Sequence, residues 1–207
     1  MEKQINKNQY SFEKYCYISR WSSYFYQIRE ILNLKVKDVL EIGVGDGFLK
    51  NYIKNNTEIE YKSIDLNENL RPDIVGTVEE IPFADNNFDV VCAFEVLEHL
   101  PFEKFEKILK ELKRVSRQYI IISLPHFGPP VKFLIKIPFL REFKMSFKIP
   151  FYTKHILSGE HYWEVGKKHY EPKKIMKILK DNFFVKKDFV PFENQYHHFY
   201  VLGKYFF

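Results

Sequence analysis

The chain has 207 residues, of which 45% are hydrophobic and 18% aromatic, and its formal net charge is +5. This length is typical of one domain that buries a core without staples, and the two cysteines, Cys16 and Cys92, favour free thiols over a disulfide scaffold. No run approaches the ~18 apolar residues of a membrane span, and we expect no signal peptide because the first residues are polar. We therefore expect a soluble, cytoplasmic protein.

Helical and strand-like patterns alternate along the first 124 residues. A helix is predicted over 10–33, with Tyr24, Ile28, Ile31 and Leu32 on one face. Strands are predicted over 36–42, 59–66, 74–78, 88–94 and 119–124, and the run 88–94 is typical of a strand covered on both faces. Helices are predicted over 48–54 and after Pro101, the second with an apolar face made by Phe105, Ile108, Leu109, Leu112 and Val115. This alternation predicts a doubly wound, mostly parallel α/β sheet.

The alternation stops at Pro125. Residues 125–170 are rich in proline, aromatics and lysine, and we interpret them as a substrate-side cap inserted after the fifth strand of a single domain that spans 1–207. Between Val131 and Lys154 there are six basic residues and one acidic residue, interleaved with large apolar side chains. We expect the aromatics to pack on the core while the lysines extend to water. Binding to an anionic membrane surface is the next interpretation, and RNA is the last.

The last part of the chain completes the sheet. Pro172 stands at a favourable first-turn position for a helix that contains Ile175, Ile178 and Leu179. The runs 183–190 and 198–203 predict a closing antiparallel pair, which gives seven strands in all.

The sharpest motif is the run 39–47, a strand that leads into Gly43, Gly45 and Gly47. Glycines allow a tight turn and a close approach to a ligand, and a following helix offers free N–H groups. The spacing differs from that of a dinucleotide-binding loop, because Phe48 stands where the third glycine belongs. It favours a ligand with an amino acid and a ribose, and Asp65, after the second strand, can accept both ribose hydroxyls.

Over roughly Val36 to Leu124 the chain resembles the class I S-adenosylmethionine-dependent methyltransferases. The segments 41–47, 64–66, 78–83 and 88–100 resemble ordered motifs of that family. The resemblance implies a Rossmann-like fold and S-adenosyl-L-methionine as the methyl donor. Thr77 stands where the family often has aspartate, which shifts the expected adenine contact to the backbone of Val78. The implied donor-binding residues are Glu41, Gly43, Gly45, Gly47, Asp65, Leu66, Val78, Phe94 and Glu95.

An E-x-x-E-H cluster, Glu95, Glu98 and His99, comes directly after the fourth strand, where open α/β sheets place their sites. It is similar to a turn of ubiquinone-pathway O-methyltransferases and small-RNA 2′-O-methyltransferases, in which a cap histidine completes a divalent-ion site. Here the resemblance implies that His161, in the segment 159–163, joins Glu95, Glu98 and His99 around Mg²⁺ or Mn²⁺. The alternative is that the acid–histidine dipeptide only shapes the turn, as in family members without a metal.

Two histidines, His126 and His161, are the candidate catalytic residues. His126 follows the fifth strand and is suited to act as a general base, with a pocket-lining role as the equal alternative. For His169, His197 and His198 we expect structural roles.

The expected reaction is O-methylation of a small-molecule or saccharide hydroxyl, because the acids and histidines would assist deprotonation of a hydroxyl. N-methylation needs less assistance and is an alternative. Methylation of RNA or of a membrane-associated lipid, and a non-catalytic S-adenosylmethionine-binding module, are the others. The oligomeric state is left open.

Overall fold

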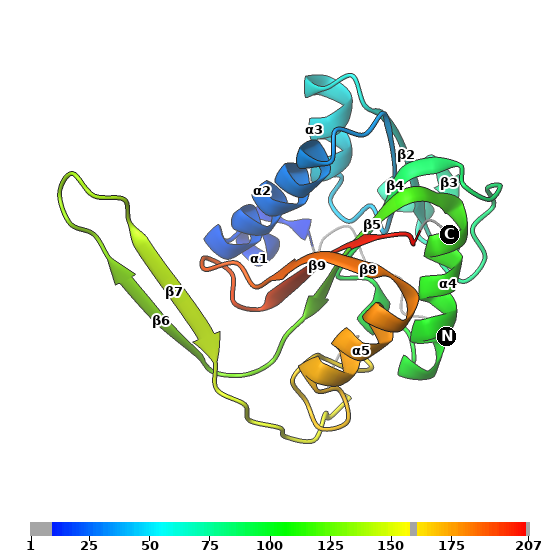
Figure 1. Cartoon of the computed structure of the whole chain (residues 1–207). Coiled ribbons are helices and arrows are strands. Elements are labelled where there is room, and N and C mark those ends of the chain that lie inside the picture. The colour runs from blue at the N-terminus through cyan, green and yellow to red at the C-terminus, as the bar shows by residue number, and fades with distance from the viewer. Residues whose placement is uncertain (1–9, 158–160, 206–207) are drawn as a thin grey trace.

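A computed structural model describes residues 10–157 and 161–205, and its centre is a seven-stranded sheet of order β3-β2-β1-β4-β5-β9-β8 (Figure 1). The strands β1 to β5 pair in parallel, while β9 runs antiparallel to both β5 and β8. The predicted Rossmann-like, mostly parallel sheet with a closing antiparallel pair is therefore confirmed.

The elements of the sheet follow one another in the expected order. The strands are β1 (Asp38–Ile42), β2 (Glu60–Asp65), β3 (Ile74–Val75), β4 (Phe88–Phe94), β5 (Ser116–Pro125), β8 (Phe184–Phe189) and β9 (His197–Gly203). The α-helices are α1 (Phe12–Tyr15), α2 (Ile18–Asn33), α3 (Phe48–Asn56), α4 (Phe105–Val115) and α5 (Pro172–Asn182). Short 3-10 turns occupy Glu68–Leu70, Leu97–His99 and Phe102–Lys104.

Two layers of helices cover the two faces of this sheet (Figure 1). On one face α2 and α3 pack on side chains such as Val39, Val90 and Ile121. On the other, α4 and α5 pack on Leu40, Val91 and their neighbours. Every residue of β4 is buried, as the nearly continuous apolar run predicts for a strand that is covered on both sides.

The helices bury the faces that the periodicity indicates, with one exception. All five apolar residues predicted for the face of α4 are buried, and Tyr24, Ile28 and Ile31 of α2 are buried too. Leu32, in contrast, is 39% exposed, so its assignment to that buried face was wrong. No helix in the described ranges is both long and apolar enough to cross a bilayer.

The helix predicted over 10–33 is broken into two. Tyr17 has an extended backbone, with φ −120° and ψ 159°, and separates α1 from α2. Contacts to the Tyr15 ring stabilise this break between the helices. The centres of the Tyr10 and Tyr15 rings lie 4.7 Å apart in an edge-on arrangement, and the Arg20 guanidinium lies 4.3 Å from the centre of the Tyr15 ring. The third strand is also shorter than predicted, because Thr77 turns out of the sheet to pair with Glu80.

The predicted packing of the segment 131–154 is wrong. Residues 130–148 form an antiparallel hairpin, β6 (Pro130–Ile135) and β7 (Phe143–Lys148), which projects from the body as an arm (Figure 1). Its large apolar side chains are exposed, with Phe133 at 47% and Phe147 at 50%. The later part of the cap does pack on the body, since Trp163 and Val165 are fully buried.

Candidate active site

The glycine turn lies where β1 meets α3. Gly43, Gly45 and Gly47 have φ values of 81°, 58° and 76°, in the left-handed region that glycine adopts without strain. Gly43 also needs its missing side chain, because a Cβ there would lie 2.5 Å from Cγ2 of Val96. The turn is therefore held close to the segment that follows β4.

Asp65, at the end of β2, is bonded to this turn. Its Oδ2 accepts a hydrogen bond of 2.8 Å from the Val44 N–H, and its Oδ1 accepts one of 2.9 Å from the Asn67 N–H. The carboxylate thus caps its own turn and also fixes the glycine turn of the neighbouring strand. This places an acidic group beside the proposed donor pocket, as the motif order implies.

Glu41 lies beneath the glycine turn. It is buried, and the Tyr61 hydroxyl donates a hydrogen bond to its Oε2. Burial raises the pKa of Glu41 to about 8, and the nearby Asp46 and Asp65 carboxylates act in the same direction. Glu41, which was predicted to bind the donor, is thus buried and bonded to Tyr61.

The other expected donor contacts differ in exposure. Leu66 is 52% exposed beside Asp65, whereas Phe94 is buried and packs near the Phe199 ring. Val78 is buried in the core on the α4 side of the sheet, so only its backbone remains for the predicted adenine contact.

The N-terminal helices lie over the glycine turn. Tyr24 of α2 donates a hydrogen bond to Asp46, and Tyr10 lies 4.0 Å from the position that a Gly45 Cβ would take. Burial raises the pKa of Tyr15 to about 12. The Nε of Arg20 is buried without a hydrogen-bond partner.

Glu95 begins the acidic cluster directly after β4. Its backbone is in the left-handed region at φ 54°, a strained conformation for a non-glycine residue that is concentrated at functional sites. One carboxylate oxygen is buried without a hydrogen-bond partner, and the other lies 3.5 Å from Nε2 of His197. Burial raises the pKa of Glu95 to about 7, while Arg20 and His161 favour its charged form.

His197, at the start of β9, supports Glu95 from below α2. Its Nδ1 lies 2.9 Å from the Ser23 hydroxyl, which also accepts a hydrogen bond from Asn194. Burial lowers the pKa of His197 well below its usual value, so the ring is neutral. His197 thus lies beside a predicted site residue, Glu95, and its contacts are consistent with the expected structural role.

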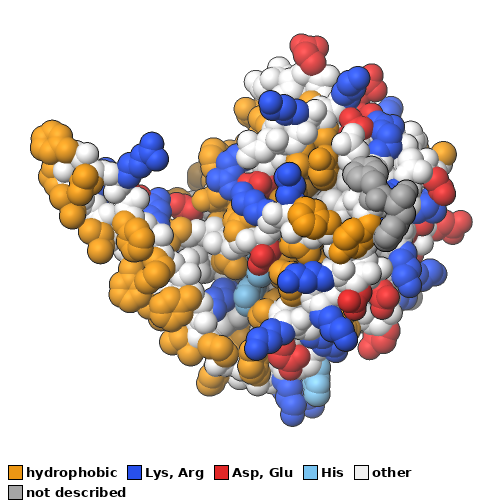
Figure 2. Space-filling model, viewed as in Figure 1, with side chains coloured by type: hydrophobic (Ala, Val, Ile, Leu, Met, Phe, Trp, Pro, Cys, Tyr) orange, Lys and Arg blue, Asp and Glu red, His pale blue; other side chains and the backbone are white. Residues whose placement is uncertain are grey.

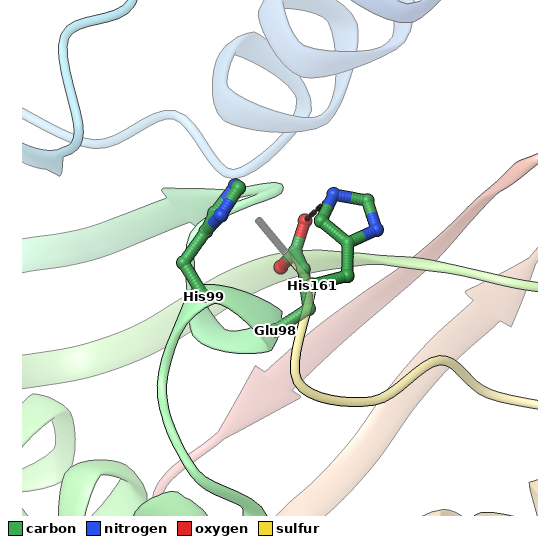
Figure 3. A group of neighbouring side chains, drawn as sticks. All are labelled: Glu98, His99 and His161. Carbon is green, nitrogen blue, oxygen red and sulfur yellow. Dashed lines mark ion pairs between the residues drawn. The ribbon is translucent and has the colours of Figure 1, made fainter. Parts of the chain in front are cut away.

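Glu98, His99 and His161 converge at one place (Figure 3). One side-chain ligand atom from each lies within 4.8 Å of the others. Both carboxylate oxygens of Glu98 are buried without a hydrogen-bond partner, and one lies 3.9 Å from Nε2 of His161. Burial raises the pKa of Glu98 well above its usual value, and the Glu95 carboxylate acts in the same direction.

Glu95 is not part of this convergent group, which holds three of the four residues predicted as metal ligands. Its carboxylate faces His197, as described above. The left-handed backbone at Glu95 turns the chain before Glu98, so the two carboxylates have different partners.

His161 is oriented by the cap itself. Its Nδ1 lies 3.2 Å from Oε1 of Glu164, which also accepts a hydrogen bond of 2.7 Å from the Tyr196 hydroxyl. Burial alone would raise the pKa of Glu164, but the hydrogen bonds from His161 and Tyr196 hold it below its usual value. An ionised Glu164 accepts a hydrogen bond from the Nδ1–H group, which leaves Nε2 of His161 directed towards Glu98.

His126 lies in a different environment. Its Nδ1 is 3.1 Å from Nδ1 of His198, and its carbonyl accepts a hydrogen bond from Lys148. It lines a cavity of about 320 Å³ under the arm, with Lys148, Asp188 and His198 among its walls. Burial lowers the pKa of His126 to about 3, with Lys148 and His198 adding to the effect. The structure therefore separates the two candidate bases, and only His161 lies with the acidic cluster.

Several residues of this site were not predicted as functional. Three of them, Glu164, Tyr196 and His197, lie more than 110 residues beyond the glycine turn and outside the motifs of the first 124 residues. The signal that could have found them is topological. Because β9 is antiparallel, its first residues lie at the carboxyl ends of the parallel strands, where sites form.

Residues 40–121 match a family model that is described as a methyltransferase domain. The match covers the glycine turn, Asp65 and the whole acidic cluster, and it ends before the cap. The sequence matches none of the curated proteins with which it was compared.

Solved structures share the fold over nearly the whole chain. One is an S-adenosylmethionine-dependent methyltransferase from Aquifex aeolicus, with 15% identity, a TM-score of 0.60, and coverage of 98% of this chain and 100% of that one. A second is magnesium protoporphyrin IX methyltransferase from Synechocystis PCC 6803, solved with bound SAH, with 12% identity, a TM-score of 0.62, and coverage of 99% and 90%. A third is a small RNA methyltransferase, with 13% identity, a TM-score of 0.63, and coverage of 89% of this chain but 25% of that one. At these identities the likeness shows the fold alone.

Proposed function

We propose that the chain is a class I S-adenosylmethionine-dependent methyltransferase that methylates a hydroxyl oxygen of a small molecule or saccharide. The observation that carries the proposal is the pair formed by Glu164 and His161, which directs a ring nitrogen towards the buried acidic cluster after β4. Amine methylation needs no such base, because a neutral amine is nucleophilic enough to attack the methyl carbon first and to release its proton to water afterwards.

The donor supplies a methyl group on a sulfonium that is already activated, so the protein's task is to align the acceptor and to remove one proton. Nε2 of His161 accepts the hydroxyl proton, and Glu164 stabilises the resulting imidazolium through Nδ1. As the acceptor oxygen forms its bond to the methyl carbon, the carbon–sulfur bond breaks and its electron pair stays on sulfur. Asp65 and the glycine turn hold the donor in place.

We test this with labelled S-adenosylmethionine and a panel of sugar, phenol and amine acceptors. His161→Gln lowers turnover by about 10²–10⁴-fold, because a general base contributes that much, and leaves the affinity for the donor unchanged. The matched control is His169→Asn, an exposed histidine of the same cap with φ 76°, where asparagine tolerates the backbone. Methylation of amines alone, or full turnover of His161→Gln, contradicts the proposal.

A divalent ion is a second candidate for the same place. Glu98 fits it, because a buried carboxylate with no hydrogen-bond partner needs a cation or a proton. Together Glu98, His99 and His161 offer one carboxylate and two imidazoles, a set that suits Mn²⁺ better than Mg²⁺ because Mg²⁺ prefers oxygen ligands. A bound ion would stabilise the oxyanion of the acceptor directly.

Calorimetric titration of the ion-free protein with Mn²⁺ distinguishes the two candidates without an acceptor. If the ion site exists, the wild type binds one Mn²⁺, while Glu98→Gln binds at least about tenfold more weakly. Full turnover of protein that elemental analysis shows to be free of metal excludes the ion and leaves His161 as the base.

A further inference from the structure

The arm, residues 130–148, has two chemically different faces. Its strands pair as Val131 with Phe147, Phe133 with Met145 and Ile135 with Phe143. Directly paired residues share a face, and successive residues alternate between faces. One face is therefore wholly apolar: Val131, Phe133, Ile135, Phe143, Met145 and Phe147. The other carries the polar and basic side chains, Lys132, Lys144, Ser146 and Lys148, together with Pro130 and Leu134.

The polar face is the one that meets the body of the protein. Lys144 forms an ion pair of 2.9 Å with Glu193, and the ammonium groups of Lys132 and Lys144 lie 5.1 Å and 5.5 Å from the centre of the Phe192 ring. The Gln195 amide donates a hydrogen bond to Ser146. These contacts fix the orientation of the arm, and its apolar face consequently points outward.

The outward face is exposed along its whole length (Figure 2). Phe133, Ile135, Phe143, Met145 and Phe147 are each between 45% and 54% exposed, and the described chain offers no element that covers them. The apolar surface continues beyond the base of the arm through Ile149, Phe151, Tyr152, Ile156 and Leu157, which are 48% to 75% exposed. A contiguous apolar surface of this extent indicates an interaction site.

The tip of the arm joins apolar side chains to cations. Phe139 is fully exposed, Ile137 and Leu140 are more than half exposed, and Lys136 and Arg141 stand on either side of this group. Large apolar side chains flanked by lysine and arginine are typical of segments that lie in the boundary between lipid headgroups and acyl chains.

The apolar face of the arm could be covered by a second copy of the chain or by a membrane, and the charge of the segment favours one of them. From Val131 to Lys154 there are six basic residues and one acidic residue. Three of the basic residues, Lys132, Lys144 and Lys148, contact the body, while the other three, Lys136, Arg141 and Lys154, are exposed at the tip and beyond the base of the arm. A second copy of the chain would bring two such segments together, and like charges repel. An anionic surface attracts the same charge. We propose that the arm docks the protein onto an anionic phospholipid bilayer through its outward apolar face and its tip.

The test uses the full chain and vesicles, with neither donor nor acceptor, so its result is independent of the reaction proposed above. The wild type should co-sediment with vesicles of phosphatidylglycerol and phosphatidylcholine, and should bind pure phosphatidylcholine vesicles at least about tenfold more weakly. Phe139→Asp should lower binding to the anionic vesicles by about tenfold or more. The matched control is Phe25→Asp, an exposed phenylalanine of α2 that is 58% exposed and lies outside the arm; it should bind like the wild type.

Equal circular dichroism and equal affinity for S-adenosylhomocysteine establish that each variant is folded. Absence of co-sedimentation, or equal binding by Phe139→Asp and the wild type, overturns the proposal. So does a dimer in light scattering that Phe133→Asp converts to a monomer while vesicle binding stays at the control level, because the apolar face then belongs to a second copy.

Discussion

At the scale of single residues, Asp65 has two roles, one in fixing the turns around it and one in binding the donor. It accepts hydrogen bonds from two backbone N–H groups, and it is the acid that the resemblance assigns to the ribose. Asp65→Asn removes the charge and one acceptor oxygen. We expect donor affinity to fall by about 1–3 kcal/mol, or roughly 5- to 150-fold in Kd, because charge-assisted hydrogen bonds are lost.

Calorimetry with S-adenosylhomocysteine measures this loss. Glu68→Gln is the matched control, since Glu68 is an exposed acid three residues further on, and it should bind as tightly as the wild type. Equal affinity in Asp65→Asn would mean that the donor site was assigned to the wrong strand end.

Glu41 should make the protein less stable as the pH rises, whereas most carboxylates make a folded protein less stable as the pH falls. Its pKa is about 8 in the fold, against 4.5 for a free glutamate. Between these values the folded state binds more protons than the unfolded state, so the stability present below pH 4.5 is lost as the pH rises to 8. The free energy of unfolding from this group should fall by up to about 1.4 kcal/mol per pH unit across that window.

Urea unfolding at several pH values checks this in the wild type and in Glu41→Gln. The variant cannot ionise, so its stability should exceed that of the wild type by more at pH 8 than at pH 5. Parallel pH curves for the two proteins would show that Glu41 does not titrate in this range.

At the scale of elements, the sequence predicted best where a pattern has only one physical solution. The apolar run of β4 and the apolar stripe of α4 must both be buried, and both are. The arm shows where prediction from a local pattern fails. Apolar and polar residues alternate in β7 and, apart from Leu134, in β6, which indicates a two-faced ribbon. The alternation does not say which face meets the body. Glu193, Phe192 and Gln195 decide that, and they are some 50 residues away in the sequence.

The arm should be dispensable for folding. Pro130 and Lys148 are directly paired at its base, so a short glycine–serine loop can join residues 129 and 149. Loss of the arm removes few contacts with the body, and insertions or deletions at such exposed segments are usually tolerated. We expect this deletion to keep its affinity for S-adenosylhomocysteine within about twofold of the wild type. Calorimetry and thermal unfolding measure both quantities, and a protein that fails to fold would show that the arm belongs to the core.

At the scale of the whole molecule, the site is assembled from three distant parts of the chain. The glycine turn, Asp65 and Glu98 come from ordered motifs, and the sequence therefore predicted them. Glu164, Tyr196 and His197 arrive through the packing of the cap and the antiparallel return of β9. No local pattern encodes these contacts, because they depend on the sheet order.

The same assembly predicts that donor binding stabilises the entire fold. S-adenosylhomocysteine at 100 times its Kd should raise the free energy of unfolding by about 2.7 kcal/mol, which for a chain of this size corresponds to about 5–10 °C in Tm. NADH is the control, because the turn lacks the third glycine of a dinucleotide loop and should give no shift. Equal shifts with both ligands would contradict the reading of the glycine turn.

The arm is a ribbon of only two strands, and in the described chain neither outer edge pairs with another strand. Each edge carries backbone N–H and C=O groups that water can satisfy and hydrocarbon cannot, at several kcal/mol for each group left unsatisfied. Hydrogen bonding therefore limits how deep such a ribbon can enter a bilayer, however apolar its side chains are. Phe139 and its neighbours can reach the acyl chains while the backbone stays among the headgroups. The proposed attachment would then be shallow and reversible, and lipid charge would determine how long the protein stays at the surface.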